Sequence, residues 1–124
     1  MKPIKTSVEA LYNSKEPTGV AILDEMVGIL RKTRIIAVAD FATILDVNPY
    51  ELAMMVRMLT GTTPRELIAR WRLLQARDLL RSHRFDAISD RPRRLTAVAN
   101  QCGWRSNRVL LNVARRYGFD LEKQ

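Results

Sequence analysis

The apolar residues of this chain recur at the spacing of amphipathic helices. Leu23, Met26 and Leu30 begin the pattern, and they lie on one face of a helix. A second apolar stripe of the same kind follows within residues 38–45. Clusters of β-branched residues, which would favour strands, are scarce. The pattern therefore predicts an all-α protein.

Capping residues mark where further helices begin and end. Asn48 is a favourable N-cap residue, and Pro49 suits the first helical position, where no backbone N–H bond is needed. We expect this helix to end at Gly61, which can adopt the left-handed conformation. A longer helix is predicted from about Pro64 to Ser82. Its apolar residues occupy more than one side, which is typical of a helix packed between two units.

The order of short helix, tight turn and short helix occurs twice, at about 38–60 and at about 95–117. We interpret each as a helix-turn-helix unit, with the long helix joining them. Trp71 and Trp104 belong to the apolar pattern and are predicted to be buried. The predicted segments are a flexible N-terminal segment (1–20), a first helix-turn-helix unit (21–62), a linker helix (63–83), an Arg-rich loop (84–94), a second helix-turn-helix unit (95–118) and a tail (119–124).

Residues 61–80 contain six residues whose spacing, without any gap, is characteristic of one protein family. They are Gly61, Pro64, Arg72, Ala76, Leu79 and Leu80. This stretch resembles the DNA-binding domain of the AraC/XylS family of bacterial transcription regulators. Downstream, Val98-Ala99 and Gly103-Trp104 resemble the family's Ile-Ala and Gly-Phe pairs. The resemblance covers about residues 23–118. It implies two homeodomain-like helix-turn-helix subdomains joined by a central linker helix, which address successive segments of the DNA major groove.

The chain departs from the family pattern in both recognition helices. Val56 stands in the first one where the family has phenylalanine. The second recognition helix is one residue shorter than the pattern, which leaves its register open. Either Val109 and Val113 or Leu110 and Ala114 occupy its two buried positions.

Basic residues gather in one part of the chain. Residues 57–118 contain 14 arginines, no lysine and 4 acids, a net charge of +10, whereas the whole chain carries +8. A positive electrostatic field produced by clustered arginine side chains is typical of a protein that binds polyanions. The planar guanidinium pairs with phosphate oxygens and with guanine edges, which the lysine ammonium cannot do. We therefore expect double-stranded DNA as the partner.

The candidate DNA-binding residues come from the two recognition helices. Those of the second helix surround its preceding turn and its outward side. They are Arg105, Ser106, Asn107, Arg108, Asn112 and Arg115. Arginine and asparagine are the side chains that form paired hydrogen bonds with guanine and adenine. Those of the first helix are Tyr50, Met54 and Arg57. Because Met54 and Met58 lie off the apolar stripe, the alternative for this helix is a surface that binds a protein partner.

The sequence offers little chemistry for catalysis. It contains one histidine, His83, and one cysteine, Cys102, and no spacing of ligands that would build a metal site. We therefore expect no enzyme activity, no metal and no cofactor. Neither a signal peptide nor an apolar run of membrane-spanning length is found, so a cytoplasmic location without membrane contact is predicted.

These features predict a sequence-specific duplex-DNA-binding transcription regulator without its own ligand-sensing domain. The alternative is a protein-interaction module that keeps the fold but has lost specific DNA reading. The methionines of the first recognition helix and the shortened second one favour this alternative. RNA binding is a weaker option, because aromatic side chains that would stack on unpaired bases are not interleaved with the arginines.

Overall fold

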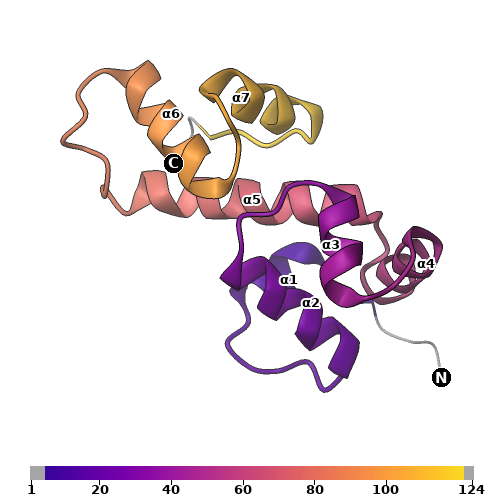
Figure 1. Cartoon of the computed structure of the whole chain (residues 1–124). Coiled ribbons are helices and arrows are strands. Elements are labelled where there is room, and N and C mark those ends of the chain that lie inside the picture. The colour runs from indigo at the N-terminus through magenta and orange to yellow at the C-terminus, as the bar shows by residue number, and fades with distance from the viewer. Residues whose placement is uncertain (1–4, 122–124) are drawn as a thin grey trace. The chain divides into compact units, whose positions relative to one another are not determined.

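The computed structural model describes residues 5–121, and its regular structure is helical (Figure 1). Within these residues the chain forms seven α-helices and no β-strand. The prediction of an all-α protein is thus confirmed. The helices are α1 (Val8–Asn13), α2 (Ala21–Lys32), α3 (Val38–Leu45), α4 (Pro49–Thr60), α5 (Pro64–Arg81), α6 (Arg91–Cys102) and α7 (Asn107–Arg116).

The helices belong to two compact units whose boundary falls inside α5. The first unit extends to Trp71, and the second begins at Arg72. The N-terminal part of the 18-residue helix α5 therefore belongs to the first unit, and its C-terminal part belongs to the second. Each part contributes buried apolar side chains to its own unit, so the predicted linker helix takes part in both cores.

The N-terminal segment that was predicted to be flexible contains α1. Ser7 caps this helix by accepting a hydrogen bond from the Ala10 N–H at 3.1 Å. Val8 is buried, and the ring of Tyr12 meets the ring of Trp71 edge-on, with the centroids 5.0 Å apart. The sequence offers a short turn at Val8–Tyr12 within this segment, and in the structure this stretch is the helix α1, which packs into the first unit. The first four residues lie outside the described part of the chain.

The loop after α1 is tied to the first turn of α2. The Thr18 N–H and the Thr18 hydroxyl both donate to Asp24 Oδ1, at 2.7 and 2.8 Å. These hydrogen bonds, above all the one from the Thr18 backbone, hold the pKa of the Asp24 carboxyl below its ordinary value. The ionised carboxylate thus anchors the loop to the helix.

The core of the first unit is built from the predicted apolar stripes. Its buried side chains on α2 to α5 are Leu23, Met26, Leu30, Phe41, Ala42, Leu45, Leu52, Val56, Leu67, Ile68 and Trp71. Trp71 is therefore buried, as its place in the apolar pattern predicted.

The ends of α3 and α4 follow the capping residues. Asp46 ends α3 in the left-handed conformation, with φ of 57°. The Asn48 side chain then accepts the Glu51 N–H at 2.9 Å, and the Glu51 carboxylate accepts the Asn48 N–H at 3.3 Å. This reciprocal pair is a capping box, and it fixes the start of α4. Gly61 ends α4 with φ of +77°, as predicted.

The second unit contains the C-terminal part of α5 together with α6 and α7. Its buried side chains are Leu73, Leu74, Ala76, Leu95, Val98, Ala99, Cys102, Trp104, Leu110, Ala114 and Leu121. Cys102 is thus a small buried side chain, and Trp104 is part of the core as predicted.

The helix α6 begins earlier than the sequence analysis placed it. Arg91 is its first residue, although the stretch up to Arg94 was predicted to be a loop. The Asp90 side chain accepts the Arg93 N–H at 3.3 Å, and Pro92 lies in the first turn, where its missing N–H costs no hydrogen bond. The boundary of the predicted loop is therefore corrected, since Asp90 and Pro92 start a helix.

The structure decides the register of α7. Leu110 and Ala114 are buried, whereas Val109 and Val113 are half-buried. Of the two registers that the sequence left open, Leu110 and Ala114 therefore occupy the buried positions.

Arg72 is a cation inside the fold. It is only 1% exposed, and its Nη1 donates to Gln75 Oε1 at 2.8 Å. Burial lowers the pKa of the Arg72 guanidinium to about 10, which a Coulombic interaction with Cys102 opposes. The guanidinium still carries its charge at neutral pH. Because it is buried, Arg72 cannot be one of the arginines that meet an external partner.

Candidate nucleic-acid interface

Four polar side chains follow one side of α7 and the turn before it. We call them the α7 basic face: Arg105, Arg108, Asn112 and Arg115. All four are exposed. Arg108, Asn112 and Arg115 lie on one side of the helix because they are three or four residues apart, whereas Arg105 lies in the turn before the Ser106 cap. Leu110 and Ala114 lie on the opposite side of the same helix. The sequence analysis predicted these four residues for DNA contact, and the structure places them together on the surface.

The N-terminus of α7 is held by the other two predicted residues of this helix. The Ser106 hydroxyl accepts the Val109 N–H at 3.2 Å, and the Asn107 side chain donates to the Pro92 carbonyl at 3.0 Å. Both polar groups are therefore used within the protein. They fix where α7 starts, and so they position the α7 basic face.

The contact between Asn107 and Pro92 also brings the first turn of α6 beside the start of α7. Arg91 and Arg93 flank Pro92 and are exposed. Helix α7 has no acidic residue at its N-cap or in its first turn, so the positive end of its dipole is not neutralised there. At α6, by contrast, the Asp90 carboxylate caps the helix and lies 3.8 Å from Arg93 Nε. The N-terminus of α7 and the arginines near it thus form a positive surface suited to phosphate groups.

From the sequence, Arg91 and Arg93 are expected in a loop broken by Pro92, where they either contact phosphates loosely or remain solvated. The structure places both in the first turn of α6 instead. The signal that could have found them is the order of Asp90, Arg91 and Pro92, an N-cap residue followed by a proline in the first turn. The start of α4 has a similar signal, because Pro49 directly follows the cap Asn48.

The helix α4 presents a different surface. Tyr50, Met54 and Met58 are 84%, 63% and 64% exposed, and their spacing of four residues aligns them along α4. We call these three residues the α4 apolar face. Arg57 is also exposed, whereas the acid Glu51 is engaged in the capping box. The predicted residues of α4 therefore lie together, but most of their surface is apolar.

The single histidine and the single cysteine do not contribute a reactive group to this surface. His83 Nδ1 pairs with Asp86 Oδ2 at 2.8 Å, and Cys102 is buried. Within residues 5–121, no group of histidine, cysteine and acidic side chains is arranged to hold a metal ion. In the same part of the chain, no helix is both long enough and apolar enough to cross a membrane.

Comparisons with protein-family models, with curated proteins and with solved structures give no match to this chain.

Proposed function

We propose that this protein is a sequence-specific duplex-DNA-binding transcription regulator. The observation that carries the proposal is the α7 basic face, an exposed set of three arginines and one asparagine on α7 and the turn before it, where the helix N-terminus is capped and free of acids. Such a row combines charge for the phosphates with side chains that form paired hydrogen bonds to base edges.

In this proposal, α3 with α4 and α6 with α7 are two helix-turn-helix units. The helix α7 enters the major groove, where Arg105 or Arg108 pairs with a guanine and Asn112 with an adenine. Arg91 and Arg93, beside the start of α7, contact phosphates and set the orientation of the helix. Ser106 and Asn107 act as positioning residues, since their polar groups hold the N-terminus of α7.

The first test is a selection of bound sequences from random duplex DNA, performed with the whole chain. We expect a clear consensus. A selection that returns no consensus would remove sequence-specific binding from the proposal.

The second test measures Arg105→Ala and Arg108→Ala on the selected duplex and on a scrambled one. At least one variant should lose about 1–3 kcal/mol of binding free energy on the selected duplex and relax specificity at one position. The matched control is Arg65→Ala, which removes one exposed arginine from the start of α5 in the other unit. Equal losses on both duplexes for both variants would exclude base reading by this pair.

The alternative function is a protein-interaction module with the same fold. It is favoured by one observation, the exposure of three large apolar side chains on the α4 apolar face. The variant Met54→Gln/Met58→Gln separates the two functions. If the protein is an interaction module, this variant should no longer bind the protein partner, and the unaltered chain should select no preferred DNA sequence. If the protein is a regulator, the variant should select the same consensus DNA sequence as the unaltered chain.

A further inference from the structure

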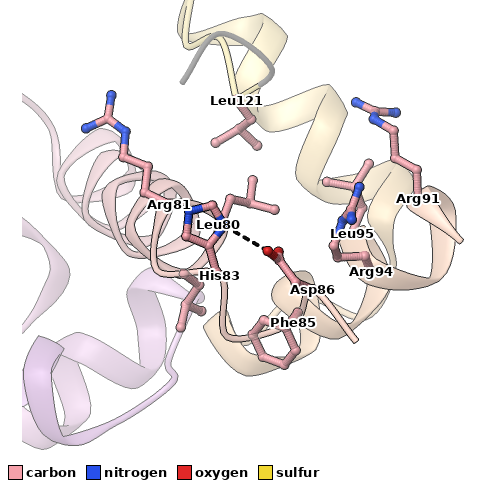
Figure 2. Close-up of a pocket in the computed structure, with 10 residues that line it drawn as sticks. Leu80, Arg81, His83, Phe85, Asp86, Arg91, Arg94, Leu95 and Leu121 are labelled. Atoms are coloured by element: carbon pink, nitrogen blue, oxygen red, sulfur yellow. Dashed lines mark hydrogen bonds and ion pairs between the residues drawn. The ribbon is translucent and has the colours of Figure 1, made fainter. Parts of the chain in front are cut away.

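The second unit contains a hollow of about 750 Å³ beside the C-terminal end of α5, the loop that follows it, and α6 (Figure 2). All the residues that line it belong to this unit. Sites for small organic molecules typically have volumes of roughly 300–1,000 Å³. The hollow therefore has the size of such a site.

One part of the wall is apolar. It is formed by Leu79, Leu80, Phe85, Leu95 and Leu121. Leu95 and Leu121 are buried, and Phe85 is half-buried. Figure 2 shows Leu80, Leu95 and Leu121 around the same space, although they come from α5, α6 and the C-terminal segment. A hydrocarbon body placed there would lose water contact on several sides.

The polar part of the wall is dominated by arginine. Arg91 and Arg94 are one turn apart on α6, and both line the hollow. Arg81 also lines it, with its guanidinium directed away from the other labelled side chains in Figure 2. The acid of this lining, Asp86, pairs with His83 at 2.8 Å. The arginines therefore outnumber the acid, and the wall is positively charged.

We propose that this hollow binds a small carboxylic acid with an apolar body. The carboxylate is held by the guanidinium groups of Arg91 and Arg94, whose fork geometry matches two carboxylate oxygens. The body packs against the leucines and Phe85. The lining has one acid, Asp86, whose Oδ2 lies 2.8 Å from His83 Nδ1, against the three arginines Arg81, Arg91 and Arg94. A cation with the same apolar group should bind more weakly, because the positive charges of the arginines repel it.

This site shares Arg91 with the proposed phosphate contacts, whereas Arg94 and the apolar wall belong to the hollow alone. The α7 basic face is an exposed row of polar side chains, whereas the hollow combines arginines with an apolar wall. The test is therefore made on the whole chain without DNA. Absence of carboxylate binding in this test would not contradict the proposed DNA binding. Absence of a DNA consensus would likewise not contradict carboxylate binding in the hollow.

The first experiment compares three probes that share one body: 1-naphthoate, 1-naphthalenemethanol and 1-naphthylmethylammonium. Titration calorimetry at low salt should show that 1-naphthoate binds at least about tenfold more tightly than either of the others, which is the effect of one charge-assisted contact. Equal affinity for the three probes, or no binding of 1-naphthoate with a Kd below about 1 mM, would overturn the proposal.

The second experiment uses variants on the two parts of the wall. Arg94→Gln should weaken 1-naphthoate binding about tenfold or more and leave 1-naphthalenemethanol binding unchanged. Phe85→Ala should weaken both probes, since it removes apolar contact area. The matched control is Arg93→Gln, because this arginine precedes Arg94 on α6, has a side chain 84% exposed and does not line the hollow. A loss in Arg93→Gln as large as that in Arg94→Gln would show that general charge, and not this site, attracts the carboxylate.

The third experiment locates the probe. Amide chemical shifts of the unaltered protein should change on addition of 1-naphthoate for His83, Phe85, Leu95 and Leu121, which all line the hollow. Because this measurement needs no variant, it keeps its meaning even if one of the substitutions unfolds the chain. Shift changes confined to α4 or to the α7 basic face would overturn the assignment.

Discussion

The helices α4 and α7 are built on the same plan and present opposite surfaces. Each begins with a side-chain cap, from Asn48 in α4 and from Ser106 in α7, and each buries an apolar stripe. Outside, α4 presents the α4 apolar face and α7 presents the α7 basic face. The buried stripe is selected by packing within the unit, whereas the outer face is free to be selected by a partner. The proposed contact with DNA therefore rests on α7 more than on α4.

The largest expected effect is the dependence of DNA binding on salt. If the protein neutralises about five to seven phosphates, log K should fall with log salt at a slope near −5 to −6, or about a thousandfold between 50 and 200 mM salt. Fluorescence anisotropy with a labelled duplex measures this slope. A slope shallower than about −2 would mean that most of the arginines are not at the interface, and the contrast between the two helices would lose its functional meaning.

The second prediction tests whether the two helices are equally well packed. Leu52 in α4 and Leu110 in α7 are both fully buried. Leu52→Ala and Leu110→Ala should each lower the free energy of unfolding by about 2–5 kcal/mol, because each leaves a cavity. Urea unfolding followed by circular dichroism measures the change.

The controls for these core variants lie on the outer sides of the same helices. Met54→Ala and Asn112→Ala should alter the free energy of unfolding by less than about 0.5 kcal/mol. A large loss in either control would show that the outer face is needed for folding, and that it cannot be assigned to a partner alone.

The third prediction compares the two outer faces directly. Arg115→Ala should weaken binding to all duplexes alike and reduce the magnitude of the salt slope by about one, since it removes a phosphate contact. Met54→Gln/Met58→Gln changes no charge and should leave the slope unaltered. The same anisotropy titrations measure both variants. If the methionine variant weakens DNA binding as much as Arg115→Ala does, the α4 apolar face meets DNA and the proposed difference between the helices is wrong.

The smallest effect concerns the caps. Asn48→Ala and Ser106→Ala should each cost about 1 kcal/mol of stability, because each leaves a backbone N–H at a helix start without its side-chain acceptor. Thermal unfolding measures the loss, and Asn48→Asp and Ser106→Asp are the controls that keep an acceptor. Ser106→Ala should in addition weaken DNA binding, whereas an unchanged affinity would argue against a positioning role for Ser106.

Local features of the sequence were enough to predict much of the helical structure. The cap at Asn48, the proline that follows it and the glycine at 61 act within a few residues of one another, so their effect can be seen without knowing the fold. The same holds for the exposed residues of the α7 basic face, which follow from helical spacing once the helix is placed. The start of α6 had a local signal of the same kind, Asp90 with Pro92, which was misread as a loop.

Other features depended on partners far away in the chain. The register of α7 could not be chosen from spacing, because valine, leucine and alanine all suit a buried position, and only the packing of the second unit selects Leu110 and Ala114. In the same way, α1 is a six-residue segment too short to be stable by itself, and its place in the fold includes the contact of Tyr12 with Trp71.

The sequence by itself thus determined the helical class, most helix ends and the arginine-rich character of the second half. Tertiary structure decided which apolar residues face inward on α7, that α1 belongs to the core, and that residues of α5, α6 and the C-terminal segment surround one hollow. The physical reason is the range of the interactions. Capping and helical spacing act over one or two turns, whereas burial depends on side chains that only the folded chain brings together.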